Sequence, residues 1–184
     1  MPPMPAKTVF IAFGSNLGDR LSNITAALKQ LAKLGEIKQI SPLFETKPEG
    51  YLNQNNFING AVEFKTTLPP LELLKELKKI EKNLGRKKTF QNAPRPIDLD
   101  IIFYEGIILN SPVLTLPHPA AHLREFVLLP LSFIAKDFMH PMLKKPVKTL
   151  LSEIMATKTV STCKVYKDGD LLYNFLQQKI TGGI

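Results

Sequence analysis

Two segments of the chain carry apolar residues at every third or fourth position, which is the spacing of one buried face of an α-helix. The first covers residues 21–34 and is followed by Gly35, a residue type that commonly ends a helix in left-handed geometry. The second begins at Pro69 and Pro70, which suit a first helical turn, and runs to Gly85. The pattern therefore predicts two amphipathic helices.

Four other segments are rich in β-branched and aromatic residues, which is typical of β-strands. They cover residues 9–13, 37–45, 57–65 and 97–104. The resulting order of strand, helix, strand, strand, helix, strand predicts an α+β fold. We expect a ferredoxin-like split βαβ sandwich, in which the helices pack on one side of an antiparallel sheet. Residues 126–138 are apolar enough to form a further helix despite Pro130.

The length of 184 residues is that of one domain. No internal repeat or linker divides the chain, so we expect a single domain over residues 1–184 with a core of about residues 8–155. Residues 156–184 form a C-terminal extension of uncertain structure, because they lack a clear periodicity. We expect the extension to add a strand or a helix that covers an edge of the sheet.

The strand at residues 57–65 carries an aromatic and an amide side chain on one face. Side chains alternate along a strand, so Ile58 and Val62 share one face while Phe57 and Asn59 share the other. If the apolar face packs in the core, Phe57 and Asn59 point into a cleft or into solvent.

Two carboxylates, Asp98 and Asp100, interrupt an otherwise apolar strand. Their spacing places both on the same face. Burial and mutual repulsion disfavour such a pair unless cations neutralise it, and Mg²⁺ is the natural ion because it takes one or two carboxylates together with phosphate oxygens and water. The alternative is two edge-strand acids that face solvent or pair with lysines.

The charge of the chain favours an anionic partner. Lys and Arg number 24 against 16 Asp and Glu, a net charge of +8, which suits nucleic acid, an acidic lipid surface or a polyphosphate. Six cationic or titratable residues around the acid pair could bind the phosphates of a triphosphate: Arg86, Lys87, Lys88, Arg95, His118 and Arg124. For Lys87 and Lys88 alone, an exposed helix face is the simpler interpretation.

Other features exclude whole classes of protein. The single cysteine, Cys163, cannot form an internal disulfide, and no apolar run approaches the ~20 residues of a membrane helix. The first residues lack the apolar core of a secretory signal, so we expect a cytoplasmic protein without a membrane partner. His118 and His122 are spaced as zinc ligands on a helix could be, but Pro119 follows directly and no third ligand is evident. We expect His140 and Cys163 to be structural.

Four motifs together resemble the hydroxymethyl-dihydropterin pyrophosphokinases of folate biosynthesis. They occur in that family's order and near its spacing, from about residue 9 to residue 151. A lone Asp-x-Asp is a weak signal, whereas the four together are highly specific. The motifs are residues 11–19 (IAFGSNLGD), 57–62 (FINGAV), 93–101 (APRPIDLDI) and 116–126 (LPH through REF).

The resemblance implies an ATP-dependent pyrophosphokinase domain that transfers the β,γ-pyrophosphoryl group of ATP to 6-hydroxymethyl-7,8-dihydropterin and releases AMP. It implies two Mg²⁺ ions, held by Asp98 and Asp100, and a direct in-line transfer. Neighbouring folate-pathway enzymes are further candidate partners. By position, the catalytic residues are Arg86, Arg95, Asp98 and Asp100; the ATP-binding residues are Arg86, Lys87, Lys88, Arg95, His118 and Arg124; and the pterin-binding residues are Thr46, Pro48, Phe57, Asn59, Asp98 and Phe126.

Two other functions fit parts of the pattern. Split βαβ sandwiches commonly bind RNA, but the carboxylates on the strand at 97–104 would repel an RNA backbone, so we expect no nucleic-acid partner. A metal-dependent nucleotidyltransferase would also use paired strand carboxylates with magnesium. The Phe57 and Asn59 pair distinguishes the pterin enzyme from it.

Overall fold

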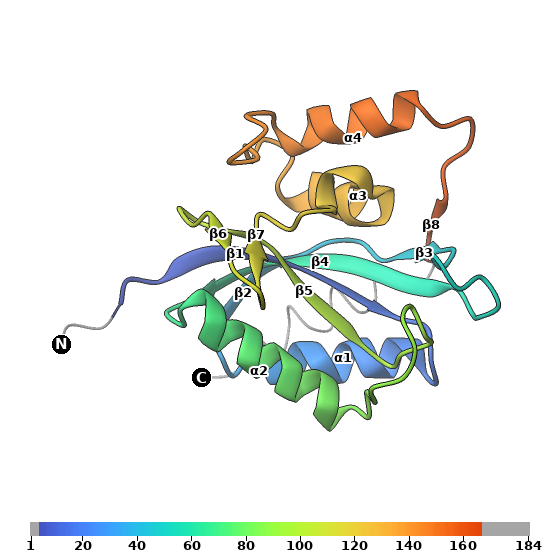
Figure 1. Ribbon diagram of the computed structural model, residues 1–184, viewed down its shortest axis with the longest axis horizontal. Helices are drawn as coiled ribbons and strands as arrows, with labels where there is room; N and C mark the ends of the chain where they lie inside the picture. Colours follow the sequence, from blue (N-terminus) through green and yellow to red (C-terminus); the bar gives the residue numbers. More distant parts are fainter. Residues whose placement is uncertain (1–3, 167–184) are drawn as a thin grey trace.

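In residues 4–166, the part of the chain that the structure describes, six strands form one antiparallel sheet in this computed structural model (Figure 1). The strand order is β5-β1-β4-β3-β8, and β2 also pairs with β4. A separate hairpin is formed by β6 (Leu109–Asn110) and β7 (Thr115–Leu116). The strands of the main sheet are β1 (Lys7–Ser15), β2 (Glu36–Ile40), β3 (Phe44–Thr46), β4 (Phe57–Thr66), β5 (Asp98–Tyr104) and β8 (Cys163–Val165).

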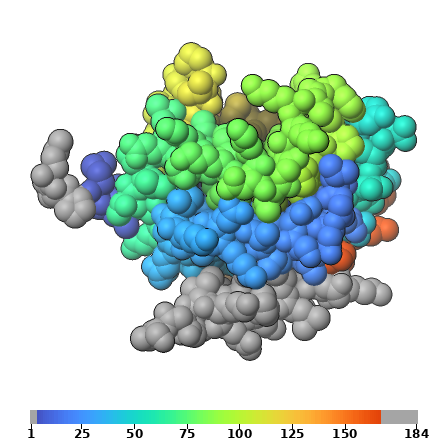
Figure 2. Space-filling model, turned by 90° about the horizontal axis from the view of Figure 1, so that it is seen from below, coloured from blue at the N-terminus to red at the C-terminus, as the bar shows by residue number. Residues whose placement is uncertain are grey.

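Helices cover both faces of this sheet (Figure 1). The predicted helices α1 (Arg20–Leu31) and α2 (Pro70–Asn83) lie side by side on one face, as Figure 2 also shows. On the other face lie α3 (Glu125–Ile134) and α4 (Val147–Ala156), and a 3₁₀ turn, η1 (Ala121–Leu123), precedes α3. The expectation of helices on one side holds for α1 and α2 alone, so the molecule has three layers.

Both faces of the sheet are apolar, and this explains the third layer. On β4, Ile58, Val62 and Phe64 pack into the core beneath α1 and α2. Ala61 lies on the opposite face and packs with Phe103 in a second cluster that α3 and α4 cover. Alternation along each strand therefore places apolar side chains in two cores, one on each face of the sheet, and neither face is exposed to solvent as a whole.

Glycine at position 35 has a different role from the predicted one. Helix α1 ends at Leu31, and the glycines with positive φ include Gly85, at 94°, but not Gly35. A Cβ on Gly35 would lie 2.3 Å from the carbonyl oxygen of Lys65 and 2.7 Å from the ring of Phe64. Glycine is thus required there for close approach to β4, while Gly85 follows α2 as predicted.

Two further predicted elements have different limits. The segment 37–45 is not one strand: β2 ends at Ile40 and β3 begins at Phe44. Between them the hydroxyl of Ser41 accepts a 2.8 Å hydrogen bond from the amide of Ala61, so a side chain replaces part of the strand pairing. The predicted helix at 126–138 begins one residue earlier and ends at Ile134.

Part of the C-terminal extension covers a sheet edge, as expected. Strand β8 pairs with β3, with Cys163 opposite Thr46 and Val165 opposite Phe44. Residues 167–184 of the extension lie outside the described residues. Within the described part, no helix is long and apolar enough to cross a membrane.

Candidate active site

A pocket opens where β4, β5 and β3 meet the first turn of α3. Strand alternation brings Phe57 and Asn59 into it from β4, and Asp98 and Asp100 from β5. Six of the residues predicted for the site therefore come together with Arg95 and Arg124 in one lining. The full lining is Thr46, Lys47, Glu49, Phe57, Asn59, Asn92, Arg95, Asp98, Asp100, Arg124 and Phe126.

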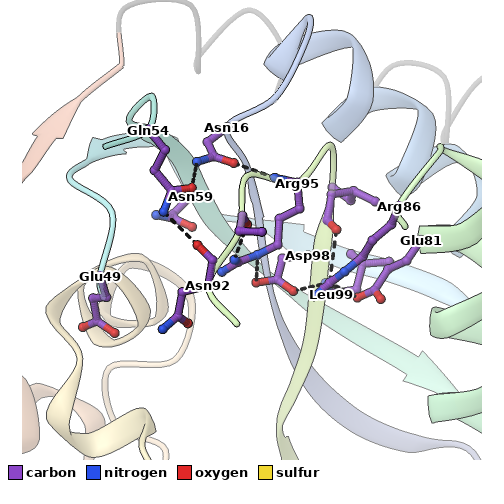
Figure 3. Close-up of polar contacts among 12 residues, drawn as sticks. Asn16, Glu49, Gln54, Asn59, Glu81, Arg86, Asn92, Arg95, Asp98 and Leu99 are labelled. Carbon is purple, nitrogen blue, oxygen red and sulfur yellow. Dashed lines mark hydrogen bonds and ion pairs between the residues drawn. The ribbon is translucent and has the colours of Figure 1, made fainter. Parts of the chain in front are cut away.

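Asp98 lies between two guanidinium groups (Figure 3). Its Oδ1 is 2.6 Å from Nη1 of Arg86, and its Oδ2 is 3.0 Å from Nε of Arg95. Burial alone would raise the pKa of Asp98, but the charges and hydrogen bonds of Arg95 and Arg86 outweigh it and lower the pKa. Asp98 is therefore a fixed anion that orients both arginines.

Asp100 is two residues away on the same face and has the opposite electrostatics. Burial and the negative charge of Asp98 raise the pKa of Asp100 to about 7. Lys78 and Arg86 oppose this rise, but only in part. A partly buried carboxylate without enough positive charge beside it has the character of a cation ligand.

Sequence reasoning missed a third carboxylate, Glu81 on α2. Its side chain is only 4% exposed; it lies 3.0 Å from Nη1 of Arg86 and accepts a 3.0 Å hydrogen bond from the amide of Leu99. Glu81 therefore fixes Arg86 from the side opposite Asp98 and ties α2 to β5 (Figure 3). Its position within a lysine-rich helix gave no signal, because its partners lie up to 18 residues away.

Aromatic and amide groups form the other end of the pocket. The side-chain amide of Asn59 donates a 2.5 Å hydrogen bond to Oγ1 of Thr46. The guanidinium of Arg95 lies 4.8 Å from the centre of the Phe57 ring, and that of Arg124 lies 5.6 Å from the ring of Phe126. Two rings, an amide and a hydroxyl thus face the space beside the carboxylates, which suits a flat heterocycle with polar edges.

A second, more open groove of about 890 Å³ lies beside the first pocket, between α2 and the loop at 86–95. Arg86, Lys87, Lys88 and Arg95 line it together with Lys78 and Lys82. Arg95 lines both spaces. The acid pair therefore stands near the junction of a small pocket and a basic groove.

Two predicted site residues are not in either lining. The first is His118, whose Nδ1 accepts a 3.1 Å hydrogen bond from the amide of Ala120. Its pKa is lowered by burial and by Arg124, and Asp98 opposes this shift, so His118 is within electrostatic range of the acid pair. The second is Pro48, which is buried in the loop after β3.

The loops at 47–56 and 86–95 meet beside the pocket. The rings of Tyr51 and Phe90 make an edge contact at 5.1 Å, and Gln54 donates a 2.9 Å hydrogen bond to the carbonyl of Asn92. Asn16 also donates to Gln54, at 2.7 Å, and accepts from the amide of Arg95 (Figure 3). On the opposite side, Glu49 lies 3.4 Å from Arg124.

The remaining candidate ligands lie outside this site. Among residues 4–166, no group of three or more His, Cys, Asp or Glu side chains could hold a metal ion. His140 is buried and its Nδ1 accepts from two backbone amides, which fits the expected structural role. Burial raises the pKa of the Cys163 thiol to about 12.

Comparison with known proteins gives consistent matches. The model of the family described as 7,8-dihydro-6-hydroxymethylpterin-pyrophosphokinase (HPPK) matches residues 10–136. The 2-amino-4-hydroxy-6-hydroxymethyldihydropteridine pyrophosphokinase of Aquifex aeolicus is 42% identical over 146 residues, 79% of this chain and 91% of that protein. The folic acid synthesis protein FOL1 of Dictyostelium discoideum is 40% identical over 96% of this chain, which spans only 29% of that protein.

Solved structures agree on the fold. A crystal structure of a triple mutant of Plasmodium falciparum HPPK-DHPS has a TM-score of 0.72 and 16% sequence identity, and the match covers 90% of this chain and 47% of that chain. The relatives named pyrophosphokinase and the family model agree with the four motifs in the sequence. The chain is an enzyme that belongs to the 7,8-dihydro-6-hydroxymethylpterin-pyrophosphokinase family of folate synthesis.

Proposed function

We propose that this enzyme transfers the β,γ-pyrophosphoryl group of ATP to 6-hydroxymethyl-7,8-dihydropterin and releases AMP. The observation that carries the proposal is that Asp98 and Asp100 line the aromatic-amide pocket, while Asp98 is ion-paired with Arg86 and Arg95, which line the basic groove. A pterin in the pocket and a triphosphate in the groove would meet at the two carboxylates. The hydroxymethyl oxygen attacks the β-phosphorus, the bond from that phosphorus to the α,β-bridging oxygen breaks, and the hydroxyl proton is released.

The pocket supplies groups for the pterin. Phe57 and Phe126 offer ring faces for stacking, and Asn59 offers an amide that can match the fixed donors and acceptors of the pterin edge. Thr46 orients that amide through its hydroxyl. Asp98 and Pro48 complete the proposed pterin site. Pro48 contributes by shaping the loop after β3.

The cations supply groups for the phosphates. Arg86 and Arg95 are held in place by Asp98, so their guanidiniums are oriented before ATP binds. Lys87 and Lys88 line the basic groove, and Arg124 lies at the pocket. His118 and Arg124 complete the proposed ATP site. We infer that Arg86 and Arg95 act in catalysis by stabilising the charge that develops on the transferred group.

Asp98 and Asp100 fit Mg²⁺ as ligands. Both are hard oxygen donors, and the raised pKa of Asp100 reflects a shortage of positive charge at its carboxylate. With two carboxylates from the protein, phosphate oxygens and water would complete each coordination shell. Two bound Mg²⁺ ions would supply charge neutralisation across the triphosphate and favour an in-line displacement.

The finer organisation of the chain is also part of the proposal. We infer a ferredoxin-like split βαβ core, which the strand order β5-β1-β4-β2, with connections through α1 and α2, supports. We infer one pyrophosphokinase domain with a core of about residues 8–155, cytoplasmic, with other folate-pathway enzymes as partners; the family match at residues 10–136 supports the core.

One assay tests the reaction. The protein is incubated with Mg²⁺, ATP and reduced 6-hydroxymethylpterin, and the nucleotide product is identified. We expect AMP that forms only when the pterin is present. Formation of ADP, or release of inorganic pyrophosphate as a nucleotidyltransferase would give, contradicts the proposal.

A further inference from the structure

A buried carboxylate outside the reacting centre connects the C-terminal extension to the pocket. Glu125 is the first residue of α3, between the pocket residues Arg124 and Phe126, and it is 2% exposed. Nothing in the proposed reaction uses it. Because Glu125 lies between two residues that line the pocket, the groups that hold its side chain also affect the position of those two residues.

Among residues 4–166, the hydrogen-bond partners of the Glu125 side chain come from one short stretch of the extension. Lys158 donates to Oε2 at 3.0 Å, and Thr162 donates to the same oxygen through its amide at 3.0 Å and its hydroxyl at 2.9 Å. The hydroxyl of Ser161 donates to Oε1. Burial opposes ionisation of Glu125, but these hydrogen bonds lower its pKa to about 2, so the carboxylate is charged at neutral pH.

The same stretch of the extension leads directly into the opposite wall of the pocket. Strand β8 starts at Cys163, one residue after Thr162, and Cys163 pairs with Thr46 of β3. Thr46 lines the pocket and accepts the hydrogen bond from Asn59. One short segment, residues 158–165, thus contacts the α3 wall through Glu125 and the β3 wall through strand pairing.

We propose that Glu125, Lys158, Ser161 and Thr162 form a clamp that sets the position of the Arg124–Phe126 wall relative to Thr46 and Asn59. Glu125 is a positioning residue for substrate binding, and it acts through its neighbour Phe126. The identification of the bound molecule as a pterin rests on the proposed function. The clamp's donors lie beyond the family match, which ends at residue 136.

The first turn of α3 depends on hydrogen bonds from outside the helix for its position. Phe126 can stack on a ligand only if the first turn of α3 stays at a fixed distance from β4, and a turn at a helix N-terminus is held by few bonds of its own. Hydrogen bonds to a charged acceptor are roughly twice as strong as neutral ones, and here a single buried carboxylate receives them from three residues. Removing them frees one wall of the pocket without changing a residue in it.

The test removes the two hydroxyl donors and leaves Glu125, Lys158 and the pocket intact. In the double variant Ser161→Ala/Thr162→Val, we expect the Kd for fluorescent 6-hydroxymethylpterin, measured with Mg²⁺ and a non-hydrolysable ATP analogue, to rise about tenfold, because a lost hydrogen bond to a charged group corresponds to a factor of about ten or more and only part of that loss affects pterin binding. The Kd for the ATP analogue alone should rise less than the Kd for the pterin, because Arg124 is only one of the six proposed ATP-binding residues. Thr162→Ser keeps both donors and should bind the pterin as the unchanged protein does.

A second measurement is independent of the ligand. Hydrogen exchange of the full ligand-free chain should speed up in the double variant in the first turn of α3 and in β3 together. The control Glu153→Gln, which breaks the surface ion pair with Lys145, should change neither region. If exchange in α3 and β3 is unaltered, or if exchange changes while pterin affinity does not, the clamp is wrong. If the unchanged protein binds no pterin, the proposed function fails, and coupled exchange of α3 and β3 alone decides the clamp.

Discussion

Replacing Asp100 with asparagine should stabilise the metal-free protein at alkaline pH while it removes activity. In the fold, burial and the charge of Asp98 raise the pKa of Asp100 from 3.8 to about 7. Ionised Asp100 therefore destabilises the fold, and a neutral amide in its place does not. The sign of this effect therefore tests whether the carboxylate of Asp100, unlike that of Asp98, lacks sufficient positive charge from the protein itself.

The size and the pH range follow from the raised pKa. Each pKa unit corresponds to about 1.4 kcal/mol, so the rise from 3.8 to about 7 corresponds to at most about 4 kcal/mol. Above about pH 4 the unfolded chain releases the proton of Asp100, whereas the folded protein retains it up to about pH 7. Asp100 therefore does not disfavour folding below about pH 4, and the free energy of unfolding decreases as the pH rises from about 4 to about 7. The advantage of the Asp100→Asn variant should thus grow across this window and level off above it.

Urea unfolding in EDTA measures this difference. We compare wild type, Asp100→Asn and Asp98→Asn at about pH 5 and about pH 8. Asp98→Asn should behave oppositely and lose about 1–3 kcal/mol at pH 8, because it breaks ion pairs to Arg86 and Arg95. The exposed Asp137→Asn serves as the control. An Asp100→Asn variant that is less stable than wild type at pH 8, or a gap that narrows with rising pH, would refute the reasoning.

Three further predictions concern catalysis and pterin binding. Arg95→Ala should lower kcat by about 10³-fold with a smaller change in the KM for ATP, because a preoriented cation acts on developing charge; a change in KM alone would contradict this. Asn59→Leu and Phe126→Ala should each weaken pterin binding in a fluorescence titration, and unchanged affinity in both would place the pterin elsewhere. Gly14→Ala should weaken it too, since its Cβ would lie 2.3 Å from Oδ1 of Asn59, and normal affinity would show that this amide is not a ligand.

Local patterns predicted the elements well because their information is carried by neighbouring residues. The apolar stripes of α1 and α2 and the proline start of α2 need only a few positions, and the observed helices contain them as far as Leu31 and Asn83. The predicted role of Gly35 was wrong because the requirement for glycine comes from distant residues. Phe64 and Lys65, which exclude a side chain at position 35, lie on β4. The position of α3 and α4 on the second face likewise depends on tertiary packing, which periodicity does not report.

For the site, too, the sequence predicted what depends on neighbouring residues and not what depends on distant ones. Strand alternation alone brought Phe57 with Asn59 and Asp98 with Asp100 into one pocket. Alternation cannot report which charged group pairs with which, so Glu81 and Glu125 were missed. Their partners lie between 3 and 37 residues away, and the important ones, Leu99 and Thr162, contribute backbone amides that no motif displays.

The contrast between Asp98 and Asp100 shows how one strand gives two like side chains different chemistry. Both sit on the same face of β5, but only Asp98 has arginines on both of its oxygens. Since Arg86 and Arg95 are thereby held by Asp98, and Arg86 also by Glu81, the cations remain in place whether or not phosphate is bound. Asp100 is left with less positive charge, and its raised pKa makes it the carboxylate that gains most from a divalent ion.

We infer that metal affinity should depend on pH mainly through Asp100. Magnesium titrations with an ATP analogue should therefore tighten as the pH rises from about 6 to about 8 in wild type, whereas the Asp100→Asn variant should lose most of this dependence. An equal pH dependence in both proteins would show that another group controls metal binding.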